Sequence, residues 1–134
     1  MAQLPVTIVE DMTKAPGEAR HSGTTKAVLS EHGAEQTAVF RLSPGAVIET
    51  HLHSRVFDLF VGIAGTLDIT YEGQKGSGVV RLKRNAFCSM PPGVRHEVRN
   101  NSATEEAMFL LVHAPWEGYD FIPVEFRKRE PQTS

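Results

Sequence analysis

Short apolar segments separated by turn residues run through most of the chain from Thr25 onward. Each segment has the length of a strand, and turn signals recur about every ten residues. No window has a convincing helical period, apart from a weak one at 31–36. The pattern therefore predicts an all-β protein whose antiparallel strands form a sandwich or a barrel. The predicted strands are TKAVLS, QTAVFRL, AVIETHLH, VFDLFVGI, TLDITYE, GVVRLKR, AFCSM, HEVRN and AMFLLVHA.

Length and composition narrow the classes of function. The 134 residues fit one domain with a hydrophobic core of its own. The 14 basic and 16 acidic residues nearly balance, so we expect no nucleic-acid or membrane partner. No apolar run is long enough to cross a bilayer, and MAQLPVTIVEDM lacks the basic start of a signal peptide. The single cysteine, Cys88, allows no intrachain disulfide, which fits a reducing, cytoplasmic location.

Two histidines stand one residue apart in the middle of the predicted sheet. Residues i and i+2 of a strand point to the same face, so His51 and His53 aim their imidazoles into one space. This geometry suits two adjacent ligands of a metal ion, although an isolated H-x-H is a weak signal. The turn at Pro91–Gly93 brings a third histidine, His96, to the start of another predicted strand.

The full spacing of these residues resembles the two motifs of the cupin superfamily, G-x5-H-x-H-x3,4-E-x6-G and G-x5-P-x-G-x2-H-x3-N. Residues 45–65 read GAVIETHLHSRVFDLFVGIAG and residues 85–100 read NAFCSMPPGVRHEVRN. Two positions depart from the family. Asp58 replaces the Glu of the first motif, and Asn85 replaces the Gly that begins the second motif. Asn tolerates positive φ better than most residues, so Asn85 still suits a turn. The resemblance implies a small, single-domain cupin with a double-stranded β-helix (jelly-roll) barrel.

The resemblance also implies a metal site. It assigns His51, His53 and His96 as ligands and places a carboxylate, here Asp58, beside them. Neutral imidazole suits Fe, Ni, Cu, Zn and, less well, Mn, so we expect a divalent transition metal, with Fe favoured. Three protein ligands on one side leave coordination positions open for water, dioxygen or a substrate oxygen, as in a reactive site.

The roles of two carboxylates stay open at this point. Asp58 is one methylene shorter than Glu, so it either ligates the metal directly, acts through a water, or pairs with a residue such as Arg55; we slightly favour the water. A buried charge needs some such partner. Glu49 shares the parity of His51 and His53, which makes it a candidate general base or substrate-orienting group, or a residue of the barrel rim in water.

The remaining polar and aromatic residues give weaker expectations. Arg41 and Arg95 are candidates to hold a substrate carboxylate, although arginines near motifs are more often on the surface. Cys88 is expected to be a buried, inert thiol. The other histidines, His21, His32 and His113, are expected to be non-ligands, and Trp116, Tyr119 and Phe121 to pack the C-terminal segment across the barrel. The expected apolar wall or core consists of Phe40, Phe60, Leu67, Ile69, Phe87, Met90, Val98, Phe109 and Leu111.

We expect one domain over 1–134, with an N-terminal arm at 1–25, a barrel core at 36–126 and a polar tail at 127–134. VTIVE predicts a short strand within the arm. The segment AMFLLV at 107–112 is apolar on both alternating faces, whereas a strand with one wet face should alternate. Either the arm or a partner subunit covers its second face. Because many small cupins are dimers, we expect a homodimer.

Two classes of function follow from the resemblance. The first is an enzyme acting on a small oxygen-rich molecule, either as an iron dioxygenase or as an isomerase, lyase or decarboxylase in which the metal is a Lewis acid. The second is a non-catalytic module that binds a small molecule. The fold alone does not decide between them.

Overall fold

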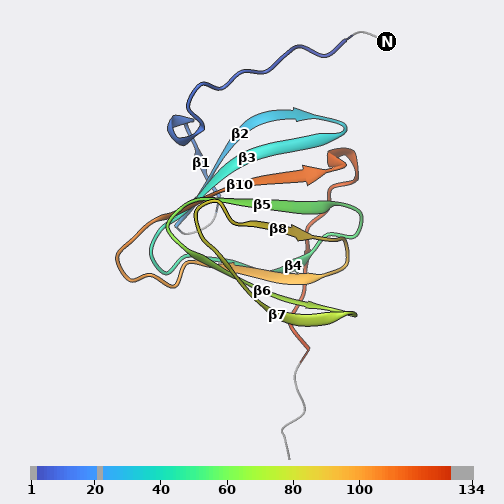
Figure 1. The fold of residues 1–134 in the computed structure, drawn as a ribbon. Helices are drawn as coiled ribbons and strands as arrows, with labels where there is room; N and C mark the ends of the chain where they lie inside the picture. The colour runs from blue at the N-terminus through green and yellow to red at the C-terminus, as the bar shows by residue number, and fades with distance from the viewer. Residues whose placement is uncertain (1–2, 21–22, 128–134) are drawn as a thin grey trace, which may run out of the picture.

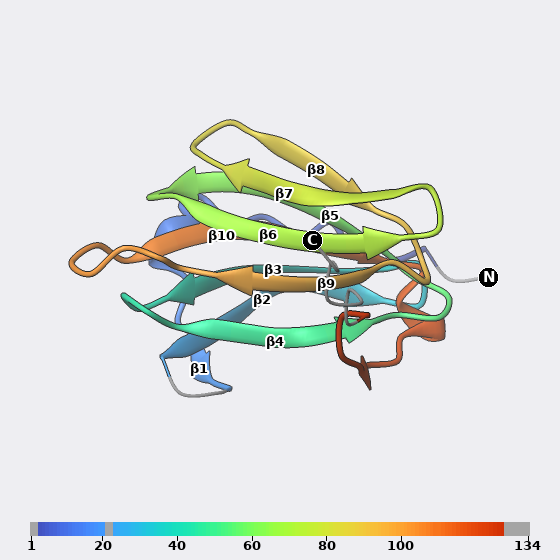
Figure 2. The same cartoon turned by 90° about the horizontal axis from the view of Figure 1, so that it is seen from below.

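The computed structural model describes residues 3–20 and 23–127, and its strands form two antiparallel sheets (Figure 1). The larger sheet has the order β1 (Glu18–Ala19), β2 (Thr24–His32), β3 (Glu35–Leu42), β10 (Ala107–Ala114), β5 (Phe57–Ala64) and β8 (Phe87–Met90). The smaller sheet has the order β11 (Ile122–Pro123), β4 (Val47–Leu52), β9 (Arg95–Arg99), β6 (Leu67–Gly73) and β7 (Gly76–Leu82). Figure 2 shows β4, β9, β6 and β7 side by side. The predicted all-β jelly roll is confirmed.

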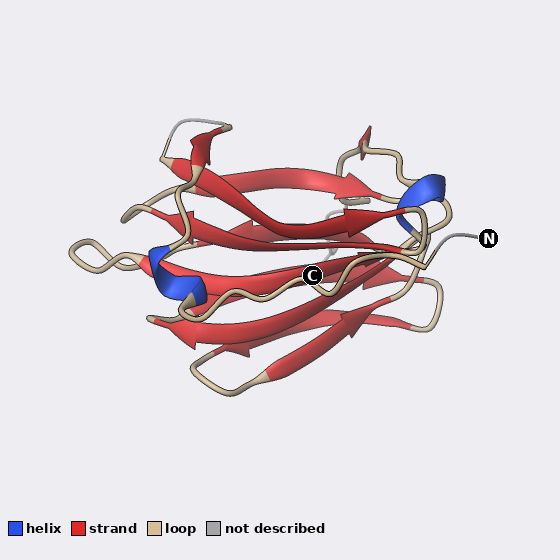
Figure 3. Ribbon diagram, turned by 90° about the horizontal axis from the view of Figure 1, so that it is seen from above, coloured by secondary structure: helices blue, strands red, loops and turns tan. Residues whose placement is uncertain are grey.

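Only two short helical turns interrupt the strands of the described chain, η1 (Met12–Lys14) and η2 (Trp116–Gly118) (Figure 3). The weak prediction of a helix at 31–36 is wrong. These residues form the β2–β3 hairpin, in which Glu31 pairs with Gln36 and His32 with Glu35. Gly33 lies at its tip, where a turn interrupts the two alternating strand patterns. No helix of the described residues is long and apolar enough to cross a membrane.

The segment VTIVE forms no strand. In Figures 1 and 3 the chain before β1 runs along the outer side of the larger sheet without joining it. No described strand pairs with this segment, so it lacks the ladder hydrogen bonds of a strand, and the side chains of Val6 and Ile8 are 85% and 79% exposed. The barrel itself begins earlier than the 36–126 that we expected for its core, because β2 starts at Thr24. Residues 128–134 of the expected tail lie outside the described residues.

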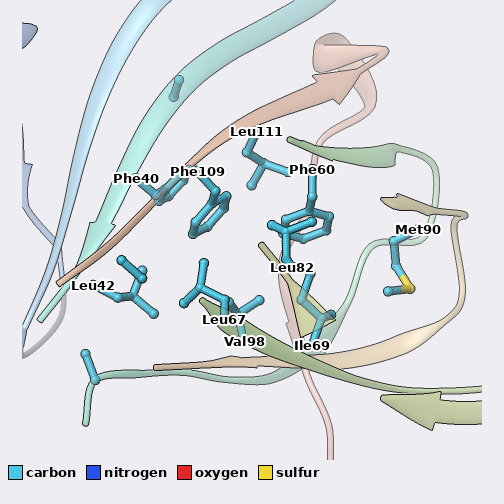
Figure 4. Close-up of a cluster of buried hydrophobic side chains, with 13 residues drawn as sticks. Phe40, Leu42, Phe60, Leu67, Ile69, Leu82, Met90, Val98, Phe109 and Leu111 are labelled. Carbon is cyan, nitrogen blue, oxygen red and sulfur yellow. The ribbon is translucent and has the colours of Figure 1, made fainter. Parts of the chain in front are cut away.

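The hydrophobic core lies between the two sheets (Figure 4). Phe40 and Phe109 stack with ring centroids 5.2 Å apart, and Phe60 packs against Phe109 at 5.5 Å. The prediction that Phe87 belongs to the core is wrong, since its side chain is 62% exposed. Phe87 begins β8, where Cys88 and Met90 point inward, so the period of two places Phe87 on the outer face. Burial raises the pKa of Cys88, which keeps the thiol protonated and unreactive.

Strand β10 lies between β3 and β5 in the centre of the larger sheet. Ala107, Phe109 and Leu111 point into the core and are buried. The opposite face, which carries Met108 and Leu110, is half-buried. The arm contacts the neighbouring strand β3, where the Arg41 guanidinium donates to the carbonyl of Thr13. The structure therefore gives β10 two apolar faces, as its sequence predicts.

Candidate metal centre

The three predicted ligand histidines and Asp58 come together at one end of the barrel. His51 lies near the end of β4, His53 directly after it, His96 in β9 and Asp58 in β5, so both sheets contribute. All four side chains are buried, and one potential ligand atom from each lies within 4.8 Å of the others.

Strand register explains this convergence. His51 and His96 are direct cross-strand partners between β4 and β9. The turn at Pro91–Gly93 is tied to the first motif, because the Gly93 N–H donates to the carbonyl of His53 at 2.8 Å. The two motifs, which 19 residues (66–84) separate in the chain, are therefore held in register by backbone hydrogen bonds.

The backbone fixes the orientation of each imidazole. Nδ1 of His51 is 2.7 Å from the carbonyl of Glu49, Nδ1 of His53 is 2.5 Å from that of Asp120, and Nδ1 of His96 is 3.0 Å from that of Val94. A carbonyl only accepts, so each Nδ1 carries the proton and each neutral ring keeps a lone pair on Nε2. This is the arrangement found around metal-binding histidines.

Asp58 completes the donor set. Its Oδ2 lies 3.0 Å from Nε2 of His53 and 3.1 Å from Nε2 of His96. Its Oδ1 accepts a hydrogen bond of 2.6 Å from Nδ1 of His113, the cross-strand partner of Asp58 in β10. Asp58 therefore pairs with these histidines, and its shorter side chain does bring an oxygen to the imidazoles.

These spacings fit a shared metal ion. Two donors at adjacent positions of an octahedral ion, each about 2.1 Å from it, lie about 3 Å apart. The contacts between Asp58 Oδ2 and the Nε2 atoms of His53 and His96 have this separation. In the metal-free site a proton on an Nε2 atom makes such a contact a hydrogen bond, and a metal ion would take the place of that proton. The donor set and its spacing therefore fit the metal that the fold implies.

The electrostatics of the metal-free site favour the metal-binding forms of His51 and Asp58, but not that of His53. Burial, together with the neighbouring imidazole of His96, lowers the pKa of His51 to about 3, so His51 is neutral at physiological pH. Burial alone would raise the pKa of Asp58, but hydrogen bonds from His113, His53 and His96 hold it well below its usual range. Burial likewise opposes the charged form of His53, but the hydrogen bond and charge of Asp58 outweigh it and raise its pKa.

A cavity of about 540 Å³ opens beside these residues. Its apolar wall includes Phe40, Phe60, Val98 and Leu111, and three aromatic residues of the C-terminal segment, Trp116, Tyr119 and Phe121, also line it. The C-terminal segment thus does more than pack across the barrel. Phe121 stacks on His51 at 4.2 Å, and Trp116 stacks on His113 at 5.7 Å. Further polar lining away from the metal ligands comes from Arg20, Thr24, Lys26, Glu31 and Gln36.

Several candidates lie elsewhere. The prediction that Glu49 faces the cavity fails because the β4–β9 register shifts between Ile48 and His51. Ile48 lines the cavity instead. Glu49 is exposed and lies beside a different pocket. Arg41 contacts Thr13 and lies 3.7 Å from Glu106, and Arg95 donates to the carbonyl of Glu125. Neither arginine lines the cavity. His32 lies 3.2 Å from Glu35 in the hairpin, and His21 lies outside the described residues.

Sequence reasoning missed two residues of the site. His113 was expected to stand apart from it, yet it holds Asp58. The period of two in β10 predicts this placement, since His113 shares the parity of the buried Phe109 and Leu111. Lys26 carries no such signal in the sequence, because a lysine in a predicted strand usually faces water.

Comparison with known proteins identifies the family. The model of the cupin domain matches residues 38–113, which is more than half of the chain. Comparison with curated proteins finds no match.

Solved structures share the fold at low sequence identity. An uncharacterized protein with a double-stranded β-helix domain from Klebsiella pneumoniae has a TM-score of 0.73 and 21% identity, over 88% of this chain and 92% of that one. An RmlC-like cupin from Shewanella frigidimarina has a TM-score of 0.68 and 15% identity, over 86% and 95%. An oxalate oxidase has a TM-score of 0.69 and 16% identity, over 87% and 63%. With the matching family model, the jelly roll and the buried histidine cluster, the chain belongs to the cupin family.

Proposed function

We propose that this protein is a metal-dependent enzyme that acts on a small, oxygen-rich organic molecule. The observation that carries the proposal is that three Nε2 atoms and Asp58 Oδ2 converge in a buried pocket that opens into a cavity. A closed structural site would have no such open side. The proposed ligands are His51, His53, His96 and Asp58. Asp58 binds the metal directly in this proposal, and not through the water that the sequence favoured.

The bound ion is a divalent transition metal, with Fe(II) favoured for its match to imidazole and carboxylate donors and open positions. Such an ion supplies either oxygen activation or Lewis-acid polarisation of a substrate oxygen. The backbone carbonyls that bind the Nδ1 atoms keep the Nε2 lone pairs aimed at one point, and the aromatic side chains of the lining narrow the space left for water. Burial raises the pKa of Tyr119 to about 12, so its phenol stays protonated at neutral pH and keeps an O–H donor beside the cavity.

Among enzymes we favour a dioxygenase that acts on an enol, diol or keto acid. The oxalate oxidase with the same fold indicates that this architecture accommodates oxidase chemistry, although a likeness at 16% identity concerns the fold alone. The test is anaerobic reconstitution with Fe(II), followed by candidate acids and diols with and without oxygen. Product formation that requires oxygen supports the dioxygenase. Turnover without oxygen indicates an isomerase, lyase or decarboxylase, and tight binding without product indicates a binding module.

We also propose that the protein is a homodimer. The outer face of β5, β8 and β10 presents uncharged side chains, and Phe57 and Phe87 on it are 43% and 62% exposed. The arm beside the larger sheet exposes Leu4, Val6 and Ile8 as well. A second copy of the chain would cover both surfaces, which are unusually apolar for a monomer. Light scattering at micromolar concentration should give twice the chain mass, and a monomer mass would contradict the proposal.

A further inference from the structure

One cationic side chain projects into the cavity from the sheet wall. Lys26 lies in β2 opposite Phe40 of β3, and its half-buried ammonium lines the same cavity as the histidines. Nζ donates to Oε1 of Gln36 at 2.6 Å. Gln36 is itself the cross-strand partner of His113, so the ammonium is directed toward the metal end of the barrel.

Aromatic rings hold this ammonium in place. Nζ lies 5.5 Å from the ring centroid of Phe40 and 5.5 Å from that of Trp116. Both contacts are within the range of cation–π interactions. An ammonium has three N–H donors, and the described residues give it one hydrogen bond, to Gln36. Two donors therefore remain for a molecule in the cavity.

The polar surroundings of Lys26 are incomplete. Burial, followed by the charge of Arg20, lowers the pKa of Lys26, which shows that neighbouring groups do not fully compensate its charge. Two residues before it on the same face of β2, Thr24 lines the cavity with its side chain 2% exposed. The Thr24 hydroxyl has no hydrogen-bond partner among the described residues. A buried hydroxyl without a partner is costly, so a ligand oxygen there would lower the free energy.

Charge balance indicates the sign of that ligand. Arg20 and Lys26 oppose Glu31 and Asp58 among the charged residues that line the cavity. The Glu31 carboxylate is engaged by the Gln36 amide at 2.6 Å, and Asp58 by the histidines. A divalent ion at the histidines would then leave the cavity net positive. Such a cavity favours an anion over a neutral molecule of the same shape.

We propose that Lys26 is the group that recognises a carboxylate of the substrate, and that the cavity takes small carboxylic acids with an oxygen donor for the metal and an apolar or aromatic body. This inference rests on the proposed function, and it narrows the substrate class. Lys26 binds the carboxylate, the histidine end receives a hydroxyl or carbonyl oxygen, and Phe40 and Trp116 contact the body between them. The arginines that the sequence suggested for this task, Arg41 and Arg95, lie outside the cavity.

The test uses the single tryptophan, Trp116, whose fluorescence reports occupancy of the cavity. Mandelate, which has a carboxylate, a hydroxyl and a phenyl ring, is titrated into the full chain, and mandelamide is its neutral counterpart of similar shape. Both are titrated into chelator-treated and Zn(II)-loaded protein. A charge-assisted hydrogen bond predicts that the unsubstituted protein binds mandelate about 10-fold or more tightly than mandelamide.

Two variants decide whether Lys26 is responsible. Lys26→Met, which keeps the length and loses the charge, should reduce the preference for mandelate to about 3-fold or less, whereas Lys26→Arg should retain part of it. The matched control Arg81→Met removes an exposed cation paired with Asp68 on the outer surface and should change nothing. Circular dichroism checks the fold, and Lys26→Gln, which can still donate to Gln36, replaces Lys26→Met if the latter unfolds.

The outcomes separate this inference from the proposed function. An unchanged mandelate preference in the neutral variant that folds overturns it, as does the absence of any preference in the unsubstituted protein. If the protein takes up no metal but Lys26 still governs mandelate binding to chelator-treated protein, the inference stands and the metal-dependent function fails. If metal loads and the neutral variants bind mandelate as before, the inference alone fails.

Discussion

Asp58 and His113 are joined by a hydrogen bond of 2.6 Å between directly paired residues of β5 and β10. The imidazole holds one carboxylate oxygen so that the other faces His53 and His96. His113 is therefore a positioning residue for the metal centre, although it is not in the ligand set itself. A short carboxylate at this position needs such support, because it cannot adjust its reach as Glu does.

Substitution of His113 should weaken metal binding without abolishing it. We expect His113→Phe, which keeps the ring and loses the hydrogen bond, to lower metal affinity by about 10- to 100-fold, as for other groups that orient metal ligands. His113→Gln, which can still donate to Asp58, should recover part of this loss. Competition with a chromophoric chelator measures the affinity. His32→Gln, in the β2–β3 hairpin away from the cavity, serves as the control. Equal affinities in all variants would disprove the positioning role.

Asp58 should behave as a true ligand. Asp58→Asn keeps the shape and removes the charge, so we expect metal affinity to fall by about 100-fold or more, which exceeds the effect expected for His113→Phe. Asp58→Glu must displace His113 or the metal, because Oδ2 already contacts both imidazoles. A gain in affinity on Asp58→Glu, measured by the same competition, would show instead that the native carboxylate is too short.

The lowered pKa of His51 predicts how stability depends on pH in the metal-free protein. The unfolded chain takes up a proton at His51 below about pH 6.5, whereas the folded chain does so only near pH 3. Between pH 6 and pH 4 the unfolded state therefore binds more protons, and the free energy of unfolding decreases as the pH falls. One proton changes this slope by about 1.4 kcal/mol per pH unit.

His51→Asn should remove this contribution. Urea unfolding of chelator-treated protein at several pH values between 6 and 4 gives the slope of the free energy of unfolding against pH. The slope for the variant should be smaller than that for the unsubstituted protein by the equivalent of about one proton. Parallel slopes for His51→Asn and the unsubstituted protein would mean that His51 titrates normally in the folded state.

The sequence predicted the fold and the three histidines because both depend on local, periodic signals. Alternation identifies the strands, and the H-x-H pair with the turn at Pro91–Gly93 identifies the ligand positions. Asn85 adopts the expected turn conformation with a φ of 69°, the only positive φ of a non-glycine residue in the described chain.

The rest of the site depends on pairings that the sequence does not reveal. Lys26 approaches the metal end through Gln36, and this requires the β2–β3 register. The prediction for Glu49 fails for a related reason. An irregularity in the β4–β9 pairing interrupts the alternation that would have turned Glu49 inward with His51. His113 was predictable from alternation alone, but its role required knowledge that β10 pairs with β5.

Asn85 gives a prediction for stability alone. Asn85→Ala should destabilise the protein by about 1–2 kcal/mol relative to Asn85→Gly, because a Cβ without a compensating local hydrogen bond disfavours positive φ. The Gly variant restores the residue that the family motif has at this position and should be at least as stable as the unsubstituted protein. Thermal and urea unfolding measure both. Equal stability of the Ala and Gly variants would contradict the observed backbone conformation.

The most direct test of the central claim is the metal content of protein purified without added metal and then dialysed against each candidate ion. Elemental analysis by mass spectrometry should give about one divalent transition-metal ion per chain in the unsubstituted protein. His51→Ala and His96→Ala should each reduce this to a trace, while His32→Ala keeps the full amount. Equal metal content in all four proteins, or none in the unsubstituted protein after reconstitution, would contradict the assignment of the metal centre.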